Sequence, residues 1–296
     1  MLTKRQFDIL EIMASSKEAV LSQRDIAKNM AVSVGTVNTV LSELSADGLV
    51  KNGQITAEGL LALEPYRVKR AVIIAAGFGS RMVPITLNTP KPLVRVDGVR
   101  IIDRIIDALH AADIQEIYVV RGYLATQFDD LLYKFPDIKF IENPAYNEGN
   151  NIGSILAAKD HLTEAYVLEA DLLIYNPQII KKYQYCSNFL TIPVQETDDW
   201  CFYVKNGYIN KIAVGGENCH KMVGISYWTK TDGLQLATDV EKVFHSPGGK
   251  ERYWDQVPLE YCKDHYKVMV RICQENDVVE IDTFNELKAI DKSYAI

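Results

Sequence analysis

The sequence of 296 residues is long enough for two domains, and its 48% hydrophobic content is typical of an ordinary globular protein. Its formal net charge of −7 argues against nucleic-acid binding through bulk electrostatics, although small polyanionic substrates would need only a local positive site. No run approaches the roughly 18 apolar residues that span a membrane, and charges interrupt the first apolar stretch, so no signal peptide is expected. The five cysteines lack C-x-x-C spacing, which favours free thiols in a reducing cytoplasm.

Residues 1–66 are predicted to form a small winged helix-turn-helix domain. An apolar stripe over Phe7–Met13 indicates a first helix, and Ser22 and Ser33 are suitable N-caps for two more. Asn52-Gly53, between two short extended runs, is a strong signal for a two-residue hairpin. A linker around Pro65 then leads to a second domain at residues 69–296.

The obvious function of the first domain is DNA binding through the helix that starts at Ser33. However, residues 1–68 hold seven Lys or Arg against eight Asp or Glu, and that helix carries no basic residue. Phosphate contacts supply most of the affinity of such domains. DNA is therefore the less favoured partner, and a role in homodimer formation or in regulation is preferred.

The stretch Arg70–Val96 carries the clearest chemical signal. A short apolar run ending at Ala75 is typical of a buried parallel strand, and Gly77 and Gly79 follow it directly. Glycines at such a turn let backbone N–H groups face a ligand, which is how proteins cradle phosphates. Arg81 and Lys91 add positive charge beside this loop.

From Arg70 onward strands and helices alternate, which predicts a three-layer, mostly parallel, Rossmann-like α/β sheet. Gly122 and Tyr123 follow one predicted strand and are expected near a nucleotide base, because ligands bind at the carboxyl ends of such strands. Asn150 or Asn151 can cap the next helix, or the same pair can contact the nucleotide together with Ser154. Both interpretations, the helix cap and the nucleotide contact, remain open.

Asp171 follows another predicted buried strand, Tyr166–Glu169. A carboxylate at the carboxyl end of a strand faces the ligand crevice, and beside a triphosphate it needs a cation. Because Mg²⁺ uses one or two carboxylates plus substrate phosphates, Asp171 is the first candidate metal ligand.

The remaining residues are predicted to bind an acceptor. Two aromatic residues precede a carboxylate in Tyr253-Trp254-Asp255, and Trp200 lies in a polar loop. These residues either belong to the core, with a capping Asp, or form an aromatic box for a quaternary ammonium group. Asp282 is expected to cap the last helix, and the five histidines show no ligand spacing.

The pattern A-A-G-x-G-x-R-x-x-P-x-T-x-x-x-P-K-P-L from Ala75 to Leu93 resembles the signature of nucleotidyltransferases that join a nucleoside triphosphate to a sugar phosphate or alcohol phosphate. From Arg70 to the C-terminus, the chain is similar to the bacterial CTP:phosphocholine cytidylyltransferases. The similar segments are AAGFGSR, GYLATQFDDL, the NN-x-x-S element, EAD, VGISYW, RYWD and EIDTFNEL. This resemblance implies Mg²⁺-dependent transfer of a cytidylyl group from CTP to phosphocholine, giving CDP-choline and pyrophosphate.

The resemblance also implies roles for individual residues. Arg81 and Lys91 would be the catalytic cations, Asp171 and Asp255 would share the metal, and Trp200 and Tyr253 would face the trimethylammonium group. The nucleotide would be bound by Ala76, Gly77, Gly79, Ser80, Gly122, Tyr123, Asn151 and Ser154.

Three alternatives remain open at this point. The first is the same reaction on phosphoethanolamine or 2-aminoethylphosphonate, since loss of methyl groups shifts specificity by only about 1 to 3 kcal/mol. The second is a sugar 1-phosphate acceptor, which would leave the aromatic pair unexplained. The third is a DNA-binding regulator with a ligand-sensing, transferase-like domain, against which the intact charged residues argue.

Overall fold

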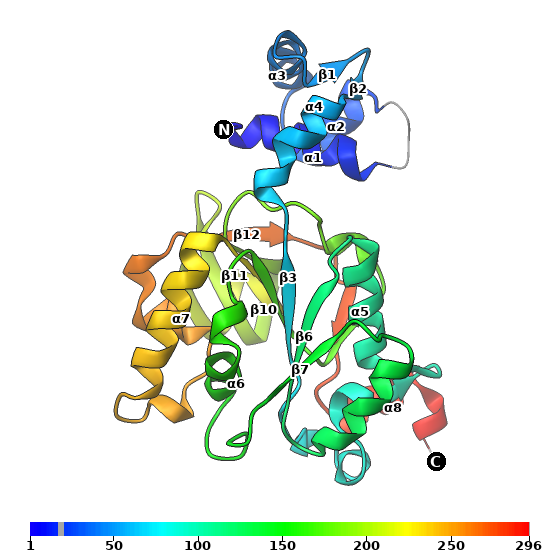
Figure 1. Ribbon diagram of the computed structural model, residues 1–296, viewed down its shortest axis with the longest axis vertical. Helices are drawn as coiled ribbons and strands as arrows, with labels where there is room; N and C mark the ends of the chain where they lie inside the picture. The colour runs from blue at the N-terminus through cyan, green and yellow to red at the C-terminus, as the bar shows by residue number, and fades with distance from the viewer. Residues whose placement is uncertain (17–20, 296) are drawn as a thin grey trace. The chain divides into compact units, whose positions relative to one another are not determined.

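The computed structural model describes residues 1–16 and 21–295. The chain divides into two compact units (Figure 1). The first contains Met1–Arg67 together with Tyr183–Tyr185, and the second contains Val68–Lys182 and Cys186–Ile296. In the described part of the chain, no helix is both long and apolar enough to cross a bilayer.

The first unit has the three helices and the hairpin expected of a winged helix-turn-helix. Ser22 and Ser33 cap their helices as predicted, since their side chains accept from the N–H groups of Asp25 and Thr36. A fourth helix, which the sequence analysis missed, follows the hairpin. The elements are α1 (Lys4–Ser15), α2 (Gln23–Met30), α3 (Val34–Ala46), β1 (Val50–Lys51), β2 (Gln54–Ile55) and α4 (Ala57–Leu63).

A segment from the middle of the chain completes the core of this first unit. The Tyr185 ring stacks on Tyr66 with 5.5 Å between centroids, and Phe7 packs against both rings. The Tyr183 hydroxyl donates to Glu64 at 2.9 Å, and the backbone N–H of Gln184 donates to the carbonyl of Tyr66 at 2.8 Å. The folded N-terminal unit therefore includes residues that local sequence patterns did not assign to it.

The second unit is built on a mostly parallel, seven-stranded sheet, as predicted, in the order β10-β12-β11-β8-β3-β6-β7. Strands β8, β3, β6 and β7 are parallel, whereas β11 runs antiparallel to β8 and forms a long hairpin with β10. The strands are β3 (Arg70–Ile74), β6 (Glu116–Arg121), β7 (Lys139–Glu142), β8 (Ala165–Glu169), β10 (Asn188–Lys205), β11 (Tyr208–Trp228) and β12 (Met269–Ile272).

Helices cover both faces of this sheet and make three layers (Figure 1). On one face, α5 (Ile101–Ala111) buries an apolar stripe against the side of β3 that carries Ala71 and Ile73. On the other, α6 (Ile152–Ala157) and α7 (Lys230–Phe244) pack on the side that carries Val72. Because β3 is buried on both faces, it reads as the continuous apolar run seen in the sequence.

Two small sheets and a short helix lie beside the main sheet. They are the hairpin of β4 (Arg95–Val96) and β5 (Val99–Arg100), the antiparallel pair of β9 (Leu172–Ile174) and β13 (Val278–Glu280), and α8 (Phe284–Ile290). Short 3₁₀ or π turns cover Glu64–Tyr66, Ser80–Met82, Ile85–Leu87, Lys91–Leu93, Ala125–Tyr133, Lys159–His161, Pro177–Ile179, Gly249–Glu251, Val257–Tyr261, Lys263–His265 and Lys292–Tyr294.

The first prediction tests the aromatic core of the N-terminal unit. Phe7→Ala removes a side chain that is 5% exposed, so the free energy of unfolding of this unit should fall by about 3 to 5 kcal/mol. All three tryptophans, Trp200, Trp228 and Trp254, belong to the second unit. The denaturation midpoint observed by tryptophan fluorescence should therefore shift less than the midpoint observed by the helical circular dichroism signal.

Leu61→Ala is the matched control, because Leu61 lies in the same unit and is 69% exposed. An equal loss of stability in both variants would contradict the assignment of Phe7 to the core.

Candidate active site

The turn after β3 has the backbone geometry expected of a phosphate-binding loop. Gly79 has a φ of +67°, and a Cβ there would lie 3.0 Å from the Cβ of Lys91. The hydroxyl of Thr86 donates to the carbonyl of Gly79 at 2.9 Å, which holds the turn closed. A Cβ at Gly77 would meet no atom within 4 Å. The loop is thus fixed at Gly79 and open at Gly77, where a ligand could approach the backbone.

Lys91 lies at the centre of the charged residues beside this loop. Its side chain is largely buried, and its Nζ lies 2.8 Å from Asp171 Oδ2 and 3.1 Å from Asp282 Oδ1. Burial acts to lower the pKa of Lys91, but the attraction of Asp171 and then Asp282 together outweighs it, so the pKa is raised and the ammonium remains charged. Arg81 Nη2, on an exposed side chain, lies 2.7 Å from the same oxygen of Asp282.

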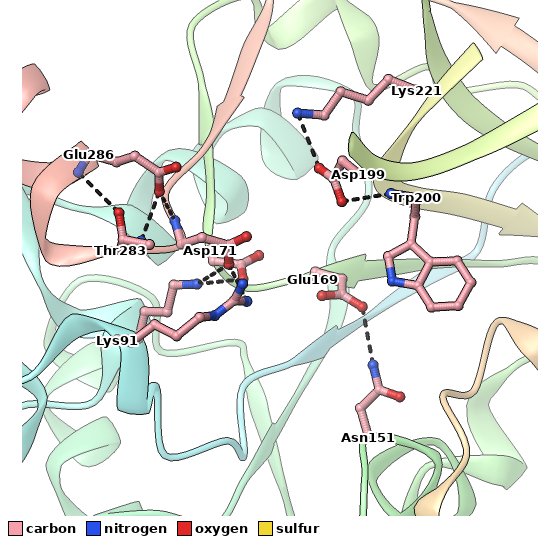
Figure 2. Close-up of polar contacts among 11 residues, drawn as sticks. Lys91, Asn151, Glu169, Asp171, Asp199, Trp200, Lys221, Thr283 and Glu286 are labelled. Atoms are coloured by element: carbon pink, nitrogen blue, oxygen red, sulfur yellow. Dashed lines mark hydrogen bonds and ion pairs between the residues drawn. The ribbon is translucent and has the colours of Figure 1, made fainter. Parts of the chain in front are cut away.

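Three carboxylates converge at the carboxyl end of β8. Asp171, Glu280 and Asp282 each offer an oxygen, and these atoms all lie within 4.8 Å of one another. The β9–β13 pairing and a hydrogen bond of 3.1 Å from the N–H of Ile281 to the carbonyl of Asp171 bring the two chain segments together. Figure 2 shows Lys91 and Asp171 in contact, beside the segment that carries Thr283 and Glu286.

Burial and the repulsion between neighbouring carboxylates raise the pKa values of two acids at this site. Burial, and then the charge of Asp171, raises the pKa of Glu169 well above its usual range and the pKa of Glu280 to about 8. Asp171 Oδ1 is buried and has no hydrogen-bond partner among the described residues. A set of carboxylate oxygens with one orphaned atom fits a hard divalent ion such as Mg²⁺.

Asp255, which is expected to share a metal with Asp171, is not among the described acids whose oxygens lie within 4.8 Å of one another here, so its role as a metal ligand stays a prediction. In the part of the chain that the structure describes, Asp282 and Glu280 are the acids grouped with Asp171. The expectation that Asp282 caps α8 is wrong, because the Thr283 side chain accepts from the N–H of Glu286 and forms a capping box with it. The T-x-x-E spacing at Thr283 was the sequence signal that leaves Asp282 free for another role.

Gly122 and Tyr123 lie against the phosphate loop. The backbone N–H of Tyr123 donates to the carbonyl of Ala76 at 3.1 Å, and the Tyr123 hydroxyl donates to the carbonyl of Thr86 at 2.8 Å. The Tyr123 ring meets Phe78 edge-on at 4.5 Å, an aromatic neighbour that sequence reasoning did not single out. Ser80, also predicted to bind nucleotide, is exposed at the start of the turn Ser80–Met82.

Asn151 connects the end of β8 to the segment predicted to bind the acceptor. Its side chain makes no cap hydrogen bond to α6, so the capping alternative is wrong. Instead its Nδ2 donates to Glu169 at 3.3 Å (Figure 2). Its Oδ1 accepts from the backbone N–H of Trp254 at 2.9 Å. Ser154 is buried, and its hydroxyl accepts from Asn143 Nδ2 at 3.2 Å.

Trp200 and Tyr253 are brought together as the aromatic-box alternative expects. Their ring centroids are 5.7 Å apart and their planes meet at 67°. The Asp199 carboxylate accepts from the backbone N–H of Trp200 at 2.7 Å (Figure 2). By contrast, Trp254 is buried in the core beneath the sheet. An aromatic corner with an acidic neighbour is suited to an organic cation.

Asp255 is a deeply buried acid that directly follows Tyr253 and Trp254 in the sequence. It is 4% exposed, and its Oδ2 has no hydrogen-bond partner in residues 1–16 and 21–295. Burial raises the pKa of Asp255 to about 6, although N–H groups of Asp255 and Gln256 act in the opposite direction. The carboxylate form is therefore costly here unless a cation accompanies it.

Comparison with known proteins agrees with this geometry. A MobA-like NTP transferase domain model matches residues 71–205, and a winged helix-turn-helix DNA-binding model matches residues 2–51. A 2-aminoethylphosphonate cytidylyltransferase of Lancefieldella rimae is 35% identical over 76% of this chain and 92% of its own length. A choline-phosphate cytidylyltransferase of Haemophilus influenzae is 31% identical over 73% of this chain and 93% of its own length.

Among solved structures, the CTP:phosphocholine cytidylyltransferase of Streptococcus pneumoniae superposes with a TM-score of 0.71 at 28% identity. The match covers 77% of this chain and 99% of that one. The predicted nucleotidyltransferase fold and the N-terminal winged helix-turn-helix are thereby confirmed. The chain belongs to the nucleotidyltransferase family that includes these cytidylyltransferases, and it carries a winged helix-turn-helix at its N-terminus.

Proposed function

We propose that this enzyme transfers a cytidylyl group from CTP to a small phosphorylated or phosphonylated amine and releases pyrophosphate. The observation that carries the proposal is the convergence of Lys91, Asp171 and Asp282 beside a glycine loop that is open at Gly77. The aromatic corner of Trp200 and Tyr253 supports an amine acceptor. The named relatives support cytidine as the nucleoside.

The reaction needs positioning and charge neutralisation more than a base. An oxygen of the acceptor phosphate or phosphonate attacks the α-phosphorus of CTP, and the bond from that phosphorus to the bridging oxygen of pyrophosphate breaks. The attacking oxygen is already an anion, so the protein need not remove a proton. Lys91 and Arg81 would stabilise the charge that develops on the phosphate oxygens, while the Gly77 backbone would hold the triphosphate in line.

Asp171 and Asp282 are the residues that would hold Mg²⁺. The orphaned Oδ1 of Asp171 and the neighbouring oxygens of Asp282 and Glu280 form an all-oxygen donor set, which fits this ion. When bound, the ion would neutralise charge on the triphosphate and the leaving pyrophosphate. The ion pairs of Lys91 with Asp171 and Asp282 hold these two carboxylates close together.

Phosphocholine is the first candidate acceptor, because Trp200 and Tyr253 offer ring faces to a quaternary ammonium. A second candidate, 2-aminoethylphosphonate, is favoured by a different observation. The buried Oδ2 of Asp255 lacks a donor among the described residues, and a primary ammonium has N–H groups to supply one. The relative that acts on 2-aminoethylphosphonate, by its name, is 35% identical to this chain.

A substrate panel tests this proposal. Pyrophosphate release from CTP is expected with a phosphorylated or phosphonylated amine, and with glucose 1-phosphate only near background. A kcat/KM for phosphocholine about 10-fold or more above that for phosphoethanolamine would mark the aromatic corner as a quaternary ammonium site. UTP and ATP, each paired with the preferred acceptor, serve as nucleotide controls. If no acceptor reacts while the protein retards DNA in a gel, the regulator alternative replaces this proposal.

A second prediction concerns the metal ligands. Asp171→Asn and Asp282→Asn should each lower kcat by about 100-fold or more and raise the Mg²⁺ concentration needed for half-maximal rate, since each removes a charged oxygen ligand. Asp130→Asn, at an exposed position, is the control and should behave like the unaltered protein. Near-normal Mg²⁺ dependence in Asp282→Asn would remove that residue from the metal site.

A third prediction follows from the raised pKa of Asp255. The folded protein holds this proton up to about pH 6, whereas in the unfolded chain the carboxyl has its ordinary pKa of 3.8. The stability gained by the protonated carboxyl is therefore present below about pH 4 and is lost as the pH rises through about 6. Over that interval the loss amounts to about 3 kcal/mol, since each unit corresponds to about 1.4 kcal/mol.

Asp255→Asn should remove this part of the pH dependence and make the ligand-free protein more stable at pH 7. The same variant should bind the acceptor less well, which a KM measurement would report. The measurement is the melting temperature of both proteins from pH 4 to pH 7. If the two melting temperatures change in parallel with pH, the raised pKa of Asp255 is contradicted.

A further inference from the structure

A second group of metal-binding side chains lies in the second unit, outside the site described above. Asp239 on α7, together with Cys262 and His265, offers one oxygen, one sulfur and one nitrogen, all within 4.8 Å of one another. Cys262 and His265 flank a single short turn, in which the N–H of His265 donates to the carbonyl of Cys262 at 2.9 Å. The C-x-x-H spacing therefore presents both side chains from the same turn.

We propose that Asp239, Cys262 and His265 form a binding site for Zn²⁺, with water as the fourth ligand. Tetrahedral zinc bonds of about 2.0 Å to nitrogen and oxygen and about 2.3 Å to sulfur put neighbouring ligand atoms roughly 3.3 to 3.6 Å apart. His265 Nδ1 now lies 2.8 Å from Asp239 Oδ2, so this pair would need to open by only about half an ångström.

The donor types select the metal. Thiolate and imidazole are preferred by zinc and similar transition metals, whereas Mg²⁺ and Ca²⁺ prefer sites made of oxygen atoms. This site therefore differs in chemistry from the carboxylate group around Asp171, and the two should not compete for the same ion.

Hydrogen bonds from neighbouring side chains orient the Asp239 carboxylate, as is common for carboxylates that bind a metal. Asp239 is 2% exposed, its Oδ2 accepts from the Tyr266 hydroxyl at 2.6 Å, and its Oδ1 accepts from Gln235 Nε2 at 3.2 Å. Such bonds fix the carboxylate in one orientation. The His265 side chain is 47% exposed, which gives an ion and a water molecule a path from solvent.

A bound ion would join α7 to the segment that follows the acceptor residues. Cys262 ends the turn Val257–Tyr261, which begins shortly after Tyr253 and Asp255. Binding would therefore anchor this segment at its far end, while the hydrogen bond from the Trp254 N–H to Asn151 anchors its start. This inference does not depend on which acceptor the enzyme uses.

The competing explanation is a plain hydrogen-bonded pair between Asp239 and His265. In that case Cys262 would be dispensable, and this difference decides between the two explanations. The experiment uses the full-length protein, freed of metal by a chelator and kept in excess Mg²⁺ so that the carboxylate group around Asp171 is filled.

Co²⁺ is then titrated as a spectroscopic substitute for Zn²⁺. We expect a thiolate-to-cobalt charge-transfer band that saturates at one equivalent and disappears when Zn²⁺ is added. Cys262→Ser should abolish the band, and His265→Asn should weaken Co²⁺ binding by about 10- to 100-fold. The matched controls Cys186→Ser and His245→Asn should retain both the band and the affinity.

Thermal unfolding provides a second readout. Zn²⁺ should raise the melting temperature of the unaltered protein and of both controls but not that of Cys262→Ser, whose melting temperature without metal should match the unaltered protein. Absence of the band, or a band and a zinc-dependent stabilisation that survive in Cys262→Ser, would overturn the proposal.

Discussion

The active site depends on the ion pairs of Lys91 with two acids that lie far apart in the sequence of the transferase unit. Asp171 follows β8, and Asp282 follows β13, yet both lie within 3.1 Å of the same ammonium. Buried like charges repel one another strongly, and the raised pKa values of Glu169 and Glu280 show that cost. Lys91 and Arg81 are paired with Asp171 and Asp282, and a divalent ion would offset the repulsion that remains among these carboxyl groups.

The fold brings these acids together through a small piece of sheet outside the main one. β9 starts directly after Asp171 and pairs antiparallel with β13, which ends just before Asp282. Backbone hydrogen bonds set this register, so the distance between the two acids does not rely on flexible side chains alone. The same pairing lets Asp282, which follows β13, contribute to a site whose other residues follow β3 and β8.

Sequence reasoning identified the parts of the site that local patterns specify. Gly79 and Lys91 lie within one continuous motif, and Asp171 follows a strand that is recognisable from its apolar run. Asp282 was misassigned because an acid before a helix is a good candidate for its cap. The T-x-x-E spacing gives the cap to Thr283 instead, and the β9–β13 pairing places Asp282 beside Asp171. Tyr185 in the N-terminal core, and Asp239 beside Cys262 and His265, are contacts between distant positions that no short pattern encodes.

The buried acids Asp255 and Glu169 connect the stability of the protein with the proposed binding of an amine. Asp255 has an orphaned oxygen, and Glu169 has its pKa raised by burial, so both destabilise the ligand-free protein at neutral pH. An organic cation held at Trp200 and Tyr253 would recover part of that free energy. The selectivity for a charged amine would then come from an unfavourable charge already present in the empty site, because an uncharged acceptor such as a sugar phosphate could not relieve it.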